Sequence, residues 1–168
     1  MLLKESVLTK DNLIKRGWRK GNDLCQFCEQ KETIQHLFLE CPVVRFTWNI
    51  VICAFNLKQI KDLKHLLSSW IQTCDKTTKQ LMLVGVAAVI WAIWKARNKA
   101  CFDHILPNSP VDILYNACSL MLDWAILQSS EERQGKLQWG VQLLKQIASE
   151  VFKSQFGWRL GQRRLLNG

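Results

Sequence analysis

Four side chains that can bind a metal lie close together near the N-terminus of this 168-residue sequence. They form the pattern C-x2-C-x7-H-x4-C and are Cys25, Cys28, His36 and Cys41. Three thiolates and one imidazole are ligands that suit tetrahedral zinc. Four protein ligands leave no position open for water, which is typical of a structural site and not of a catalytic one. We therefore expect one structural zinc ion.

The alternative is that these four residues are unrelated to one another. A buried free cysteine is common, and a histidine on an apolar helix face usually belongs to the core. Local density argues against this alternative, because three of the seven cysteines and one of the three histidines fall within 17 residues. Elsewhere, Cys101 and His104 have no second pair near them, and we expect buried thiols at Cys53, Cys74 and Cys118.

A mainly α-helical fold is expected around the zinc pattern. Apolar residues recur at intervals of three and four, and no segment alternates apolar and polar residues between hairpin turns. We expect helices over about residues 9–17, 33–41, 43–55, 62–73, 75–100 and 110–127, and a last helix that begins near Ser129. The exposed side of the third helix would hold Arg45 and Asn49. The prediction is a small CCHC zinc-stapled N-terminal module followed by a helical bundle.

The most apolar stretch covers residues 81–94, which is 14 residues, whereas a membrane-spanning helix needs about 20. We therefore expect a buried helix, central in the core, and no membrane partner. The first six residues contain no apolar run that could serve as a signal peptide. Seven cysteines, an odd number, indicate thiols in a reducing compartment, so we expect an intracellular protein.

The net charge of +9 is spread along the chain and gives a pI of about 9.4. Such an excess suits a protein that works near phosphate groups, although many basic proteins bind no nucleic acid. The local candidates for contact with RNA or DNA are Lys15, Arg16, Trp18, Arg19 and Lys20, then Lys95, Arg97 and Lys99, then Arg159, Arg163 and Arg164. The alternative is a solvated face with Trp18 packed against the zinc site.

No arrangement of catalytic residues is evident. We find no paired carboxylates, no glycine-rich phosphate loop and no nucleophile with histidine support. Polymerases and nucleases hold two metal ions with clustered aspartates, and the seven aspartates of this chain are scattered. We expect no enzyme activity and no small-molecule substrate.

The residues around the zinc pattern resemble a known family. Residues 8–18, the Cys25 and Cys28 pair, residues 32–38 and Cys41-Pro42 with Trp48 are similar to the reverse-transcriptase zinc-binding domain of plant non-LTR (LINE-type) retrotransposons. Residues 91–99 resemble the segment that often follows this domain. The resemblance covers about residues 7–103. It implies the same four zinc ligands and an accessory role, associated with nucleic acid, in the transcription and integration of the element.

The sequence departs from a whole element because the polymerase and endonuclease are missing, and no Asp-Asp pair follows Tyr115. Because the sequence starts just before the zinc pattern, we expect it to be a fragment of a longer reading frame. We expect a zinc-binding domain over residues 7–57, a tryptophan-rich helical region over 58–130, and a C-terminal helix and tail over 131–168.

The leading interpretation is a zinc-stabilised accessory nucleic-acid-binding module, derived from a retrotransposon reverse transcriptase and without polymerase activity of its own. Nuclear residence is the expectation that this role suggests. Two alternatives stay open: a protein-interaction or scaffolding module in which zinc only holds the fold, and a retrotransposon fragment without a function. A basic cluster on one face would favour nucleic-acid binding, and an exposed apolar patch would favour protein interaction.

Overall fold

The computed structural model of the chain describes residues 7–17, 22–68, 70 and 74–154. In chain order its elements are α1 (Lys10–Lys15), the π-helix η2 (His36–Glu40), α2 (Pro42–Ala54), α3 (Leu63–Ser68), α4 (Lys76–Asn98), the π-helix η3 (Lys99–Asp103), α5 (Pro110–Ala125) and α6 (Glu131–Ser154). The described residues contain no strand, only an isolated antiparallel bridge between Leu24 and Lys31. The predicted fold class, mainly α with a module of metal ligands before a helical bundle, is confirmed.

Side-chain caps explain where the two long central helices begin. Asp75 precedes α4 and accepts hydrogen bonds from the backbone N–H groups of Thr77 (2.9 Å) and Thr78 (3.1 Å). Ser109 and Asp112 form a capping box at the start of α5. The expected helix over residues 62–73 is shorter in the structure, where α3 covers Leu63–Ser68; residues 69 and 71–73 lie outside the described part.

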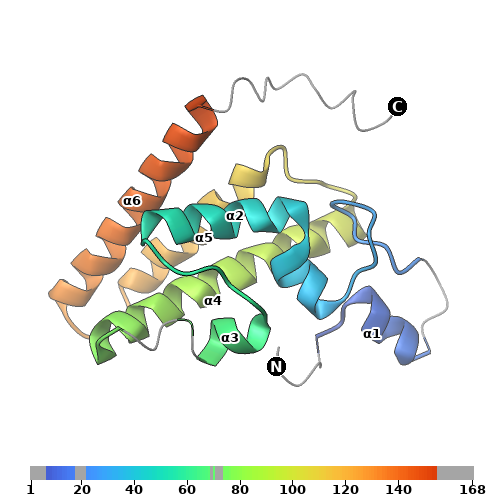
Figure 1. The fold of residues 1–168 in the computed structure, drawn as a ribbon, viewed down its shortest axis with the longest axis horizontal. Coiled ribbons are helices and arrows are strands. Elements are labelled where there is room, and N and C mark those ends of the chain that lie inside the picture. Colours follow the sequence, from blue (N-terminus) through green and yellow to red (C-terminus); the bar gives the residue numbers. More distant parts are fainter. Residues whose placement is uncertain (1–6, 18–21, 69, 71–73, 155–168) are drawn as a thin grey trace.

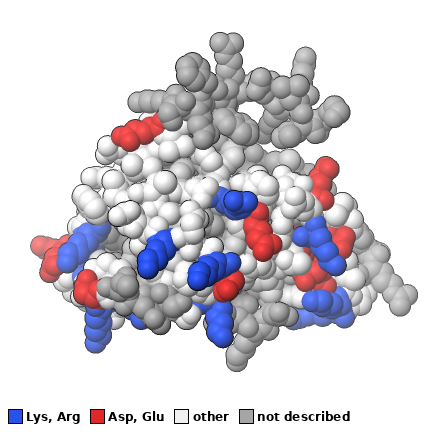
Figure 2. Space-filling model, viewed as in Figure 1, with Lys and Arg blue, Asp and Glu red and all other residues white. Residues whose placement is uncertain are grey.

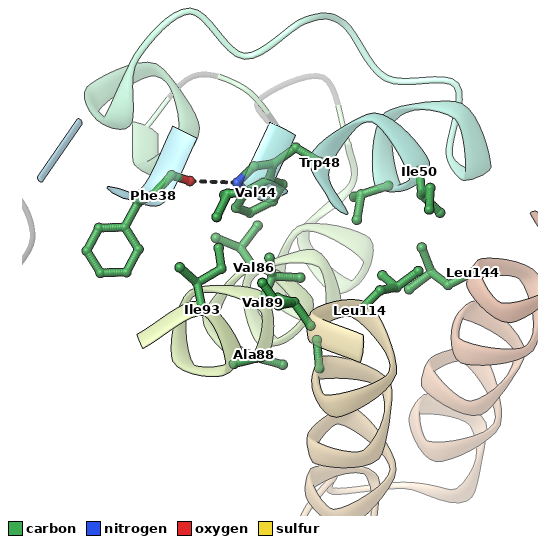
Figure 3. Packing of buried hydrophobic residues seen from close by; sticks show 14 of the residues in the cluster. Phe38, Val44, Trp48, Ile50, Val86, Ala88, Val89, Ile93, Leu114 and Leu144 are labelled. Atoms are coloured by element: carbon green, nitrogen blue, oxygen red, sulfur yellow. Dashed lines mark hydrogen bonds between the residues drawn. The ribbon is translucent and has the colours of Figure 1, made fainter. Parts of the chain in front are cut away.

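The bundle consists of α2, α4, α5 and α6, and the N-terminal module sits at the end where α4 finishes (Figure 1). Helix α5 packs against α4, α6 and α2, and α2 also packs against α6. Buried side chains of α2 face those of α4 across the core, where Val44 and Trp48 lie opposite Val86, Val89 and Ile93 (Figure 3). The Trp48 indole N–H donates a hydrogen bond to the backbone oxygen of Phe38 (2.7 Å), which joins α2 to η2.

Helix α4 is less central than its composition predicts. Its inner side is buried, but Leu83 and Trp91 on its outer side are 38% and 49% exposed. The 28 residues Lys76–Asp103 are long and apolar enough to cross a membrane, a test that core helices of soluble proteins also pass, and a third of the apolar window is buried. Helix α5 packs against the three other long helices, α2, α4 and α6, and therefore has the more central position in the bundle. Composition reveals that a helix is apolar all round, but not which sides its neighbours cover.

One hydrophobic cluster runs through the whole described chain, from Val7 to Ala148. It draws residues from the expected zinc-binding domain, from the tryptophan-rich region and from the C-terminal helix. The expected division at residues 57 and 130 stays a prediction, and these segments share one core. Between α2, α4, α5 and α6 the packing leaves an apolar cavity of about 290 Å³, lined by residues that include Phe55, Gly85, Met121 and Trp139. The expected tail, residues 155–168, lies outside the described residues.

Candidate metal centre

The first two ligands lie in a tight turn. The backbone N–H of Cys25 donates to the oxygen of Gln30 (2.7 Å), and that of Glu29 donates to the oxygen of Cys25 (2.9 Å). Glu29 closes the turn with a positive φ of 60°. Within the turn the N–H of Phe27 donates to the Cys25 Sγ (3.4 Å). The short gap between Cys25 and Cys28 therefore places both sulfurs on the same side of the loop.

The other two ligands bracket the π-helix η2. Thr33 accepts a hydrogen bond from the N–H of His36 through its hydroxyl (3.0 Å), as expected for a residue that starts a helical turn. Five residues later the N–H of Cys41 donates to the oxygen of His36 (2.8 Å). This wider turn fits the H-x4-C spacing, and Pro42 then begins α2. Cys41 is thereby fixed at the junction of two helices.

The four ligand atoms converge. All lie within 4.8 Å of one another. The Cys25 and Cys41 sulfurs are 4.0 Å apart, those of Cys28 and Cys41 are 3.8 Å apart, and the Cys28 sulfur is 3.2 Å from the Nε2 of His36. A tetrahedral zinc ion with Zn–S bonds of about 2.3 Å separates two sulfurs by roughly 3.8 Å. The donor set and its dimensions therefore fit one structural zinc ion.

The thiols titrate as one network. The hydrogen bond with Cys41 lowers the pKa of Cys25 to about 5. The same bond, with burial second, raises the pKa of Cys41 far above its ordinary value, and burial raises that of Cys28. Protein contacts alone thus favour a thiolate at Cys25 and thiols at the other two positions. A divalent cation at the centre would displace the remaining protons, because zinc binds thiolates.

Comparison with family models matches residues 1–48 to the family described as zinc-binding in reverse transcriptase. These residues form a reverse-transcriptase zinc-binding domain. The match includes all four ligands and ends inside α2. Comparisons with curated proteins and with solved structures found no match. The resemblance inferred from the sequence is thus confirmed for the domain itself.

A buried ion pair attaches the zinc-binding domain to the bundle. Glu32, fully buried, accepts hydrogen bonds from the guanidinium of Arg97 at 2.6 Å (Nη2) and 3.1 Å (Nε). The same carboxylate accepts the backbone N–H of Lys10 at the start of α1 (2.9 Å). Glu32 therefore connects α1, the zinc-ligand loop and α4. Its charge is neutralised by Arg97 and by the positive end of α1.

The tryptophan-rich segment of α4 supplies further contacts to the zinc-binding domain. Trp94 stacks on Phe38 of η2, with 6.5 Å between ring centroids. The guanidinium of Arg97 lies 5.3 Å from the centroid of the Trp94 ring, which is cation–π range. Sequence reasoning placed Arg97 among the nucleic-acid contacts. The structure corrects this, because Arg97 is only 2% exposed and its charge is engaged by Glu32.

The remaining candidates for nucleic-acid contact lie in different environments. Lys15 and Arg16 are exposed at the end of α1, and Lys15 forms an ion pair with Asp11 (3.4 Å). Lys95 and Lys99 are exposed on α4 and η3. The other candidates lie outside the described residues: Trp18, Arg19, Lys20, Arg159, Arg163 and Arg164. Among the described residues, no hydrogen bond or ion pair joins the basic candidates of α1 to those of α4 and η3.

The other cysteines do not join a metal site. Cys118 is buried as expected and Cys74 is half-buried, but Cys53 is exposed. The expectation for Cys53 was wrong because it lies two residues after the buried Val51, on the solvent side of α2. Within the described chain, the four zinc ligands are the only such group of metal-binding side chains. Sequence reasoning missed the role of Glu32, whose partner lies 65 residues away with no local signal.

Proposed function

We propose that this protein is an accessory nucleic-acid-binding module derived from a retrotransposon reverse transcriptase, of the plant LINE type, without polymerase activity of its own. The zinc ion holds the N-terminal domain together, and the bundle presents the contact surface. The role implies a reducing compartment, in which the three zinc-binding thiolates stay unoxidised, and a nuclear location. RNA or DNA is the partner, and neither a membrane nor a small-molecule substrate is required.

The observation that carries the proposal is a row of exposed aromatic and basic side chains at the end of α4 and in η3. Trp91, Lys95 and Lys99 follow one another at intervals of four on the solvent side, and Phe102, 70% exposed, ends the row. Lysines neutralise phosphates, and exposed aromatic rings stack on unpaired bases. Within the described chain, neither lysine forms an ion pair with a carboxylate. Both charges are therefore available to a phosphate backbone.

The face of the molecule seen in Figure 2 shows no single large basic patch among the described residues. On the face seen in Figure 2, Lys and Arg side chains are spread out and Asp and Glu side chains lie among them. We therefore place the binding surface at the row that begins on α4, next to the zinc-binding domain. We call Trp91, Lys95, Lys99 and Phe102 the α4 row.

The test is a fluorescence anisotropy titration with labelled single-stranded RNA and DNA, repeated over a range of salt concentrations. The wild type should bind at low salt, and the double variant Lys95→Ala/Lys99→Ala should show a salt slope smaller by about 1–2. Lys76→Ala/Lys145→Ala removes two exposed lysines elsewhere and is the matched control. Absence of binding to every nucleic acid at low salt would overturn the proposal.

One observation favours the second candidate function, protein interaction. Ile126 and Leu127, after α5, are 76% and 78% exposed, and Trp139 on α6 is 60% exposed. Exposed apolar groups of this size occur at protein contact sites. If the nucleic-acid titration fails and Ile126→Ser/Leu127→Ser abolishes association measured by light scattering or pull-down with a purified partner, this second function replaces the first.

A further inference from the structure

A second feature of the surface is a polar pocket of about 220 Å³ beside the zinc-binding domain, not part of the α4 row. It lies between η2, the solvent side of α2 and the segment between α2 and α3. Gln35, Leu39 and Glu40 line it on the side of η2. Gln35 is adjacent to the zinc ligand His36, so the pocket and the metal site share one element.

Buried apolar side chains and exposed polar side chains both line the pocket, and we call the exposed ones its rim. Leu39, Trp48 and Ile52 are buried and form the apolar part. The exposed residues of the rim carry amide groups and positive charges, and they are Arg45, Asn49, Gln59 and Lys61, with the carboxylate of Glu40 beside them. A nucleobase needs apolar contact on its faces and hydrogen-bonding partners on its edges, and the lining of this pocket contains both kinds of group.

The wall of the pocket opposite α2 is held in place by hydrogen bonds. The backbone N–H of Leu63 donates to the Oε1 of Gln35 (3.3 Å), which fixes the start of α3 against η2. The N–H of Lys61 donates to the Nδ1 of His65 (3.2 Å), and Asp62 caps the first turn of α3 through the N–H of His65 (2.7 Å). The pocket is thus formed before any ligand arrives, as most ligand sites are.

Size and charge restrict the occupant. Pockets for drug-sized ligands span roughly 300–1,000 Å³, so 220 Å³ admits one ring system and leaves a sugar and phosphate outside. Arg45 and Lys61 line the pocket with exposed side chains, and neither forms an ion pair with a carboxylate of the described residues. Their charges complement a phosphate backbone.

We propose that this pocket takes one unstacked base of a single-stranded nucleic acid, with Asn49 and Gln59 reading the edge of the base and Arg45 and Lys61 neutralising the flanking phosphates. The inference rests on the proposed function and deepens it, because it makes single strands the preferred ligand. Duplex bases are not accessible to such a pocket without being flipped out of the stack.

The test uses the full chain loaded with zinc and a labelled 12-nucleotide single strand, in its intact form and with one central abasic site, together with the matching duplex. The Asn49 side chain is exposed, so Asn49→Ala leaves the core untouched. This variant should bind the intact strand about five-fold or more weakly than the wild type, since a good pair of base contacts is worth at least that much. Gln138→Ala, an exposed amide on α6, is the matched control and should bind as the wild type does.

The abasic strand separates the pocket from general binding. Wild type should bind it more weakly than the intact strand, and this difference should be smaller for Asn49→Ala, which keeps Gln59 and the apolar lining. If Asn49→Ala matches the wild type on the intact strand while Lys95→Ala/Lys99→Ala is weakened, the pocket is not a base site although the protein binds nucleic acid. If no strand binds to the wild type, both proposals fail. If free nucleoside monophosphates compete as well as the strand does, the occupant is a free nucleotide and the inference for strands is overturned.

Discussion

Cys28 is the zinc ligand whose replacement best isolates the metal site, because it is half-buried whereas Cys25 and Cys41 are fully buried. Elemental analysis of the purified wild type should give one zinc per chain, and Cys28→Ser should lower this content strongly. Removal of the ion should also lower helicity and cooperativity, since zinc supplies of order 10 kcal/mol to the folding of small zinc domains. Circular dichroism during titration with a chelator measures the second effect.

The control for this substitution is Cys53→Ser, which changes an exposed cysteine outside the site in the same way. It should leave the zinc content and the chelator response unchanged. A wild type that contains no zinc and whose circular dichroism ignores the chelator would show that the four ligands no longer bind metal.

Cys118 gives a pH-dependent prediction. Burial raises the pKa of this thiol from its ordinary value of 9.0 to about 11. Between these pH values the unfolded chain loses the proton and the folded chain keeps it, so the free energy of unfolding falls as pH rises through this window. At pH 11 the loss from this one group is roughly 2 kcal/mol.

Urea unfolding of the wild type and of Cys118→Ala at pH 8 and at pH 10.5 measures this loss. The variant is less stable at pH 8 because it leaves a small cavity, but its stability should fall less on going to pH 10.5. Both proteins share the zinc site, so its own pH dependence cancels in the difference. If the free energy of unfolding fell equally in the two proteins, the pKa of Cys118 would not be raised in the folded state.

At the scale of residues, the sequence predicted what depends on local spacing. The four zinc ligands lie within one short stretch, so the pattern alone brought them together. Glu32 and Arg97 could not be paired in advance, because 65 residues separate them and only the packing of α4 makes them neighbours. The pocket residues Asn49 and Gln59 had no signal either, although the exposed side of α2 was predicted to hold Asn49.

At the scale of elements, the ion pair between Glu32 and Arg97 joins the zinc-ligand loop to α4. Arg97→Met should lower the free energy of unfolding by about 3–5 kcal/mol, because it leaves a buried carboxylate without its counter-charge. The double variant Glu32→Gln/Arg97→Met should recover part of this loss, since both charges are then absent. Urea unfolding of the single and double variants forms the cycle that measures the coupling.

The comparison for this cycle is Lys136→Met, which breaks the exposed ion pair with Glu132 in α6. It should have little effect, because exposed pairs contribute little. A double variant as unstable as the sum of its single variants would indicate that Glu32 and Arg97 act independently.

Two glycines test the helix interior and the helix end. An alanine Cβ at Gly85 in α4 would lie 3.8 Å from the Met121 side chain, an ordinary contact at the wall of the apolar cavity. Gly85→Ala should therefore stabilise the protein by up to about 1 kcal/mol. Gly17 follows α1 with φ of 89°, where a side chain is strained, so Gly17→Ala should destabilise it. Thermal unfolding of both variants should show shifts of opposite sign; shifts of the same sign would contradict the backbone argument.

Helix types and starts were largely predictable, since caps and proline positions are local signals. Asp75, Ser109 and Pro42 each stand at a helix start, and Asn56 ends α2 with a positive φ of 49°. The π-turns at η2 and η3 were not predicted, because an apolar period of three to four residues does not reveal one additional residue in a turn. The central position of α5 also depended on tertiary packing.

At the scale of the whole molecule, the family match and the folded unit have different boundaries. The match ends at residue 48, in the middle of α2, whose remaining turns pack against α5 and α6. The zinc-binding domain also relies on Trp94 and Arg97 of α4 for its contacts with Phe38 and Glu32. In this chain the domain is therefore one end of a larger core.

A fragment of residues 1–48 should bind zinc, since all four ligands are present, but it should not unfold cooperatively on heating. Its Glu32 would lose the buried counter-charge, and Phe38 and Trp48 would lose the α4 surface that covers them. A fragment of residues 1–154 keeps these contacts and should unfold in one transition near that of the full chain. Circular dichroism and calorimetry of the zinc-loaded fragments measure both.

If the short fragment melts as sharply as the longer one, the domain is autonomous, and the contacts of α4 orient it on the bundle without stabilising it. In that case the contacts of α4 only set the position of the α4 row beside the domain. The contribution of the row to nucleic-acid binding would then be measured separately from its contribution to folding.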